Sequence, residues 1–222
     1  MLSSTLGALG FIGPGDWEVF SDAVFLYGRS MSDELLSRKR IVLLAVLFEG
    51  GLALAALGLG WLVNQPPLQS LHMDLNSLVF GAAATVPMLL FLLLAILWPV
   101  GPLLRARALL DEVVRPLFHG CSVIELALIS FLAGLGEEML FRGVLQGLFT
   151  RWLGSWGSVG AVNLLFGLLH FVTPTYALIA GLAGVYLSCC WLWRENLLVV
   201  VIPHALFDFV ALLYVARGAG AR

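Results

Sequence analysis

The sequence predicts an all-α protein, a polytopic bundle of about six transmembrane helices. Of its 222 residues, 60% are hydrophobic and 12% charged, and the mean hydropathy is +0.98. Soluble domains carry roughly 45–50% apolar and about 25% charged residues. The apolar runs are continuous rather than alternating, which disfavours a transmembrane barrel. The net charge of −2 offers no basic surface for nucleic acid. Soluble enzymes, disordered chains and nucleic-acid binders are thereby excluded, and membrane lipids are expected contacts.

Six stretches approach the length of a transmembrane helix, which needs about 20 residues to cross a bilayer core of about 30 Å. The third is long and contains charges, and only a short turn separates the fourth from the fifth. The stretches are Ile41–Val63, Ser77–Trp98, Cys121–Phe149, Ser158–Val172, Ala177–Trp193 and Leu197–Val215.

Two further segments mix apolar and charged residues at helical spacing. Residues 16–28 predict an amphipathic helix on the membrane surface or an ordinary helix packed on the membrane domain. Residues 101–118 predict an interfacial helix or a surface connector. We expect residues 1–40 to form an N-terminal cytoplasmic or interfacial extension and residues 41–222 to form the membrane domain.

Positive charges predict the orientation, because basic residues favour the cytoplasmic side. With a cytoplasmic N-terminus, only Arg151 and Arg194 lie on the opposite side. The cytoplasmic segments then hold Arg29, Arg38, Lys39, Arg40, Arg105, Arg107, Arg115, Arg217 and Arg222. We expect a multi-pass protein of the bacterial plasma membrane or an equivalent organelle membrane, with both termini cytoplasmic.

Ionisable residues within the predicted spans are functional candidates, because each costs about 2.5–3.5 kcal/mol on insertion scales. Six of them form three clusters, whereas Glu49 and Glu125 either line the same cavity or pair with polar groups elsewhere. The full set is Glu49, Glu125, Glu137, Glu138, Arg142, His170, His204 and Asp208.

The first cluster is Glu137-Glu138 followed by Arg142. Glu138 and Arg142 are four residues apart and can pair on one helix face. Glu137 points about 100° away around the helix, so it is free to act as a general base. In the other interpretation, Glu138 and Arg142 form a purely structural ion pair, and Glu137 faces a water pocket without a catalytic role. Gly134 and Gly136, just before the acids, are expected to loosen the helix and admit water or a peptide backbone.

The second and third clusters each place a histidine on a helix face. Phe166 and His170 share one face, and Phe166 is a candidate substrate-binding residue. Alternatively, His170 only forms a hydrogen bond between helices. His204 and Asp208 share another, and Asp208 could orient the imidazole or contact substrate. In the alternative interpretation, Pro203 kinks the helix, and His204 and Asp208 only bind each other.

Helix rise predicts that the clusters share one layer of the bundle. At about 1.5 Å per residue, Glu137 lies roughly 18 Å from Phe149, the expected outer end of its span. His170 lies roughly 18 Å from Ser158, and His204 and Asp208 lie roughly 10 and 17 Å from Leu197. Three helices can therefore present polar groups to one site.

The motifs Glu-Glu-x-x-x-Arg, Phe-x-x-x-His and His-x-x-x-Asp, in this order on successive apolar helices, resemble a known family. It is the CAAX protease and bacteriocin-processing family, also called type II CAAX prenyl endopeptidase-like, and the resemblance covers residues 120–215 or so. The resemblance implies an all-helical intramembrane endopeptidase. Asp208 stands where eukaryotic members carry Asn; an ionised carboxylate cannot donate a hydrogen bond, whereas a protonated one could.

Roles follow from the resemblance, residue by residue. Glu137 would activate water, Glu138 and Arg142 would hold the motif in shape, and His170 would assist. His204 and Asp208 would stabilise the oxyanion.

Cofactor use stays open at this point. Glu137, His170 and His204 match a set of zinc ligands. If Glu137 bound the metal, Glu138 would be left as the base. We favour a glutamate-activated water with no required metal.

The expected partner is a peptide or protein substrate, which a lipid could anchor to the membrane. Two other functions compete with the endopeptidase. One is a non-proteolytic membrane scaffold or bacteriocin-immunity factor with the same fold. The other is a small proton-coupled transporter, against which the sequence shows no inverted repeat.

Overall fold

A computed structural model describes residues 38–98 and 100–218. Within these ranges every regular element is helical. The described residues belong to one compact unit, Arg38–Arg222, and the predicted amphipathic helix at residues 16–28 lies outside the described residues. The elements are α2 (Arg38–Leu62), η1 (Pro67–Ser70), α3 (Leu75–Leu97), α4 (Pro102–Leu109), η2 (Leu110–Val114), α5 (Arg115–Phe118), α6 (Val123–Glu138), η3 (Met139–Gln146), α7 (Gly147–Leu169), α8 (Pro174–Arg194) and α9 (Leu198–Arg217).

Four helices, α2, α3, α8 and α9, are long and apolar enough to cross a membrane. Each corresponds to a predicted span, with ends that differ by at most three residues. A fifth crossing is counted if residues 110–118 and 123–169, which meet at a bend of 114°, form one broken span. The protein is therefore an all-helical integral membrane protein, and the length and composition of its helices support four or five crossings rather than six.

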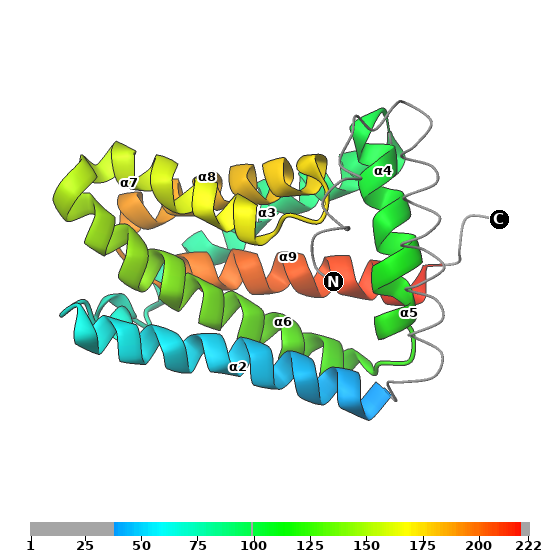
Figure 1. Ribbon diagram of the computed structural model, residues 1–222, viewed down its shortest axis with the longest axis horizontal. Helices are drawn as coiled ribbons and strands as arrows, with labels where there is room; N and C mark the ends of the chain where they lie inside the picture. Colours follow the sequence, from blue (N-terminus) through cyan, green and yellow to red (C-terminus); the bar gives the residue numbers. More distant parts are fainter. Residues whose placement is uncertain (1–37, 99, 219–222) are drawn as a thin grey trace, which may run out of the picture. The chain divides into compact units, whose positions relative to one another are not determined.

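The third and fourth predicted spans follow one another without a long loop. The chain changes direction between them at Gly154. Gly154 has φ 68° and ψ 174°, which is not helical. Because Arg142 donates to Asn163, 21 residues further on, the chain must fold back between them. In Figure 1, α7 returns alongside α6. The returning part, residues 155–169, is about 22 Å long. A bilayer core is about 30 Å thick, so this part is too short to be counted as a crossing of its own.

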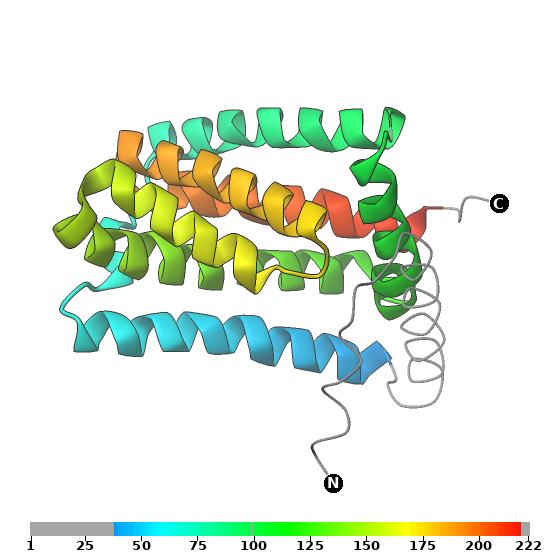
Figure 2. The same cartoon turned by 45° about the horizontal axis from the view of Figure 1, so that its top comes forward.

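Glycines set the spacing of the central helices. α6 packs between α2 and α9, and α3 covers the other side of α9, while α7 packs on α8 (Figures 1 and 2). A Cβ on Gly134 would lie 2.8 Å from the backbone nitrogen of Ala205, and one on Gly136 would lie 2.6 Å from the Glu49 carbonyl. These glycines let backbones approach closely. α6 is continuous there, so the helix is not loosened, whereas the backbone of α2 does approach it at Gly136.

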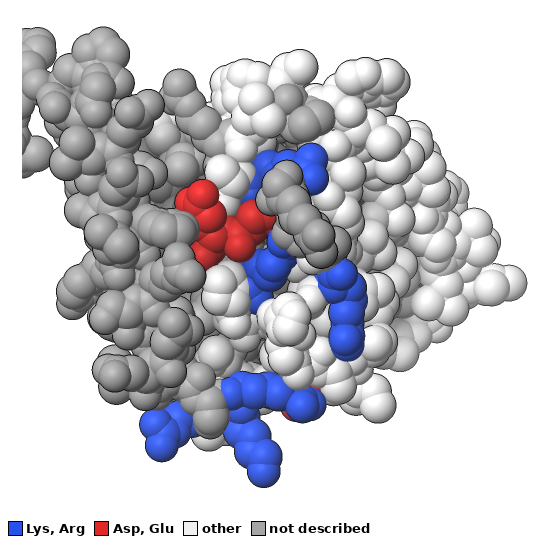
Figure 3. All heavy atoms as spheres, turned by 90° about the vertical axis from the view of Figure 1, so that its right-hand side faces the viewer, with Lys and Arg blue, Asp and Glu red and all other residues white. Residues whose placement is uncertain are grey.

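Basic residues gather at one end of the bundle, where α4, η2 and α5 cross the other helices (Figures 1 and 3). The predicted interfacial segment, residues 101–118, is helical, because it forms α4, η2 and α5. Arg115 donates to the carbonyl of Val215, and Arg217 donates to that of Cys121. Arg38 pairs with Glu125. These contacts fix the ends of four helices together, and the cytoplasmic location of this end stays a prediction.

The opposite end is organised around the loop between α2 and α3. Asn196 donates to the carbonyl of His72 and to the hydroxyl of Ser77. Asp74 caps α3 by accepting from the backbone and side chain of Ser77. These hydrogen bonds lower the pKa of Asp74, so the cap is ionised at neutral pH. A pocket of about 270 Å³ beside this loop contains none of the predicted site residues.

The reversal at Gly154 can be tested by substitution. Gly154→Ala forces a side chain into a backbone conformation that only glycine adopts readily, so we expect a loss of about 1–3 kcal/mol in unfolding free energy. No neighbouring atom lies within 4 Å of the added Cβ, so the loss would report backbone strain alone. Reversible unfolding in mixed detergent micelles measures it.

Gly160→Ala is the matched control, because Gly160 is exposed on the helical part of α7 and also has open space around it. It should be neutral or stabilise by up to about 1 kcal/mol. Equal effects of the two substitutions would contradict the turn at Gly154.

Candidate active site

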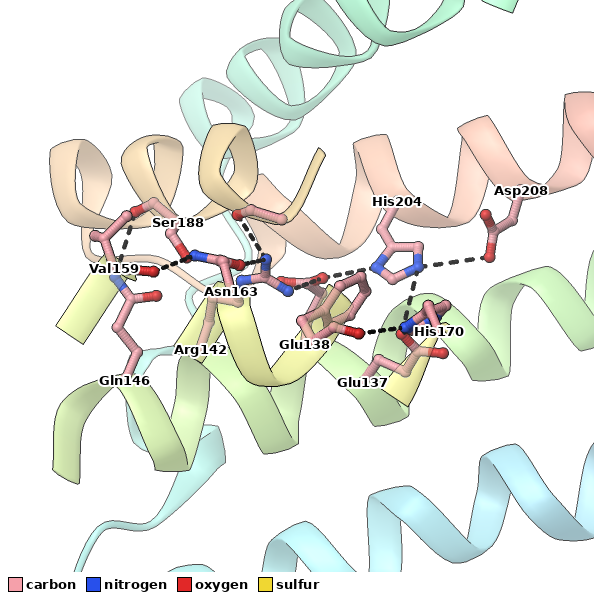
Figure 4. Close-up of polar contacts among 12 residues, drawn as sticks. Glu137, Glu138, Arg142, Gln146, Val159, Asn163, His170, Ser188, His204 and Asp208 are labelled. Atoms are coloured by element: carbon pink, nitrogen blue, oxygen red, sulfur yellow. Dashed lines mark hydrogen bonds and ion pairs between the residues drawn. The ribbon is translucent and has the colours of Figure 1, made fainter. Parts of the chain in front are cut away.

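The three predicted clusters converge inside the bundle. Figure 4 shows Glu137 and Glu138 from α6, His170 after α7, and His204 and Asp208 from α9. The Oε2 atom of Glu137 lies 3.7 Å from Nε2 of His170 and 3.9 Å from Nε2 of His204. The expectation that three helices present polar groups to one site is confirmed.

Glu138 occupies the centre of the site. Its Oε1 atom accepts hydrogen bonds from Nη1 of Arg142 at 2.8 Å and from Nδ1 of His204 at 2.6 Å. The Glu138 and Arg142 side chains are completely buried. The spacing of four residues predicts the first contact, whereas the second comes only from the fold. The buried charge of Arg142 is thereby paired, as a charge in an apolar interior requires.

His204 is oriented through its two ring nitrogens. Glu138 binds Nδ1, so Glu138 fixes the ring where the sequence suggested Asp208 could do so. Oδ2 of Asp208 lies 3.5 Å from Nε2. Acceptors face both nitrogens, so both can carry a proton, and Nε2 lies 3.5 Å from Asp208 and 3.9 Å from Glu137.

A second hydrogen-bonded layer supports Arg142. Its Nη2 atom donates to Oδ1 of Asn163 at 3.1 Å and to the carbonyl of Gly184 at 2.7 Å. Asn163 in turn donates to the carbonyl of Val159 and to the hydroxyl of Ser188. Arg142 thereby joins η3 to α7 and α8.

Asn163 and Ser188 are not among the site residues that the sequence predicts. Both lie in predicted spans and are almost or completely buried. Both are neutral polar side chains in apolar helices, which could have pointed to them. The polar candidates predicted from the sequence are all ionisable.

Phe166 positions His170. The Phe166 ring stacks on the imidazole with centroids 4.2 Å apart and contacts Phe141 edge-on at 4.8 Å. Nδ1 of His170 lies 2.8 Å from the Phe166 carbonyl. A carbonyl only accepts, so Nδ1 carries the proton, and Nε2 of the neutral ring is an acceptor facing Glu137. Phe166 is buried, and its contact with substrate stays a prediction.

One side of the site is open. The side chains of His170 and Asp208 are 27% and 31% exposed, against 11% for Glu137. Oε2 of Glu137 is buried and has no hydrogen-bond partner. At 3.7 Å from His170 it is too far for a direct hydrogen bond, yet one water can contact both atoms. The arrangement suits a polar reactant that enters past His170 and Asp208.

Glu49 and Glu125 have separate environments. Glu125 forms the capping box of α6 with Ser122 and pairs with Arg38 at the basic end. Glu49, on α2, lies within electrostatic range of Glu137, Asp208 and His204, and its carbonyl lies against Gly136, next to Glu137 in the chain. Of the two residues whose surroundings the sequence left open, Glu49 alone belongs to the neighbourhood of the site.

Metal binding by Glu137, His170 and His204 stays a prediction. The described part of the chain contains no group of three or more His, Cys, Asp or Glu residues arranged to hold a metal ion. As placed, Glu137, His170 and His204 do not form a coordination site.

A helical bundle with acids and imidazoles inside it defines an integral membrane protein with an internal polar site. Residues 119–210 match the family model described as "Type II CAAX prenyl endopeptidase Rce1-like". The match includes all three motifs and covers less than half of the chain, and over this segment the chain is similar to that family of membrane proteases. Comparisons with curated proteins and with solved structures gave no match.

The layer around Arg142 yields a stability prediction. Lysine keeps the positive charge but cannot reach the three acceptors that guanidinium binds at once. Each buried acceptor left unpaired costs about 1–3 kcal/mol, so Arg142→Lys should lower the unfolding free energy by at least that amount. Thermal unfolding in detergent, followed by circular dichroism, measures it.

Arg151→Lys is the control, because Arg151 also makes side-chain hydrogen bonds but is exposed. It should change stability by no more than about 0.5 kcal/mol. Similar losses for the two variants would show that the buried network does not hold the bundle together.

Proposed function

We propose that the protein is an intramembrane endopeptidase that hydrolyses a peptide bond through a water activated by Glu137. The observation that carries this proposal is the position of Oε2 of Glu137, which is buried, has no partner and faces two imidazole nitrogens. The family of residues 119–210 supports it. The substrate would be a peptide or protein held at the membrane, and the family description makes a lipidated one a reasonable candidate.

In the proposed first step, water donates one hydrogen to Glu137 and the other to Nε2 of His170. This contact orients the oxygen lone pair toward the substrate carbonyl. Glu137 takes the proton as the water oxygen bonds to the carbonyl carbon. The carbonyl π electrons move to oxygen, which gives a tetrahedral intermediate with one negative charge.

His204 would stabilise that charge by donating from Nε2. Glu138 holds the opposite nitrogen, so the ring cannot turn away. When the intermediate collapses, the C–N bond breaks and Glu137 returns its proton to the leaving nitrogen. The products are a new carboxyl group and a new amine. Asp208, on Nε2 of His204, would keep that nitrogen protonated rather than donate to the oxyanion itself.

Glu137→Gln tests the base. Glutamine has the same shape but cannot take a proton, so cleavage should fall by about 10²–10⁴-fold while the melting temperature stays close to that of the wild type. Mass spectrometry of membrane peptides from cells expressing either protein identifies the fragments that the active protein produces. Purified protein with those peptides then gives the rate.

Glu112→Gln removes an exposed carboxylate far from the site in sequence and should leave the fragments unchanged. Identical fragments from Glu137→Gln and wild-type cells would contradict the endopeptidase. Such a result would favour the scaffold or immunity factor.

Metal dependence is a separate expectation. If Glu137 activates water without a metal, treatment with EDTA or 1,10-phenanthroline should leave the rate on those peptides unchanged. Elemental analysis of the purified protein should give much less than one zinc per chain. Loss of activity with chelator and its recovery on adding zinc would replace the metal-free mechanism.

A further inference from the structure

The mechanism leaves one carboxylate near the site without a role. Glu49 lies on α2, outside the segment that matches the family. Its Oε2 atom is buried and has no hydrogen-bond partner among the described residues. A buried acceptor without a donor destabilises the protein unless a ligand supplies the donor. Contacts among the described residues therefore give the Oε2 atom of Glu49 no stabilising partner.

The close packing of α2 on α6 holds Glu49 in this place. A Cβ on Gly136 would overlap the carbonyl of Glu49, at 2.6 Å. The backbone of Glu49 thus touches the helix one residue before Glu137. The buried Oε2 atom lies inside the protein rather than in lipid, within electrostatic range of Glu137, Asp208 and His204.

Negative charge outweighs positive charge on this side of the site. Arg142 is engaged by Glu138, Asn163 and Gly184 and cannot compensate for other acids. His204 already has carboxylates on both nitrogens. Glu49 is left with neighbouring acids and no cation of its own among the described residues.

We propose that Glu49 binds a cationic nitrogen of the substrate, an ammonium group that enters beside Glu137. The negative surroundings attract such a group, and the unpartnered oxygen of Glu49 accepts its hydrogen bond. The ammonium group can come from a lysine side chain or from a free peptide N-terminus. Glu49 is then a specificity-determining residue contributed by α2. This inference rests on the proposed function for its substrate class.

The test measures binding rather than cleavage, with purified full-length protein in phosphatidylcholine nanodiscs. Three fluorescent, apolar peptides of equal length serve as probes: one with lysine and an acetylated N-terminus, one with acetyl-lysine and a free N-terminus, and one neutral peptide with both groups acetylated. Anisotropy should show that at least one cationic peptide binds about tenfold more tightly than the neutral peptide. The first two peptides distinguish the two sources of the ammonium group.

Glu49→Gln should abolish the preference, and Glu49→Met should do so if the glutamine variant folds poorly. Glu49→Asp, which keeps the charge, should retain part of it, and Glu112→Gln should retain all of it. Equal binding of charged and neutral peptides by the wild type would overturn the inference. An unchanged preference in the glutamine or methionine variant would also overturn it.

The two proposals fail separately. If Glu137→Gln leaves cleavage intact while the preference for a cation depends on Glu49, the proposed catalytic role is wrong and the binding role stands. If cleavage depends on Glu137 but the preference does not depend on Glu49, the endopeptidase stands and this inference is wrong.

Discussion

The Glu138 carboxylate accepts hydrogen bonds from Arg142 and from His204, and this shared acceptor connects most of the molecule. Through His204 it joins α6 to α9, and through Arg142 it joins η3 to the Asn163 amide of α7 and the Gly184 carbonyl of α8. In a bilayer no water is available to replace these partners. Packing of five helical segments and orientation of the imidazole therefore depend on the same few hydrogen bonds.

That dependence explains why the adjacent acids have different environments. Glu138 is fully buried and engaged by two donors, so it is suited to hold other groups in place. Glu137, about 100° around the helix, faces His170 and His204 at distances too long for direct hydrogen bonds. One acid is a fixed partner, and its neighbour is free to exchange a proton with a reactant.

The π-helical segment η3 begins directly after Glu138 and includes Arg142. π-helical turns in proteins are rare and are frequently found at functional sites. Here the wider turns lie where a fully buried guanidinium must reach partners on α7 and α8. The local sequence carries no evident signal for this geometry, because the segment reads as an ordinary apolar helix with one arginine.

The sequence by itself determined the membrane class, four long helices to within three residues of their ends, the pairing of Glu138 with Arg142, and the three clusters at one depth. These follow from hydropathy and helical spacing, which act over a few residues. Tertiary structure decided what depends on contacts between distant segments: the reversal at Gly154, the bond from His204 to Glu138, the Asn163 layer and the approach of Glu49 to the site. A sequence specifies which polar groups are costly to bury, but only the packing of helices determines which of them meet.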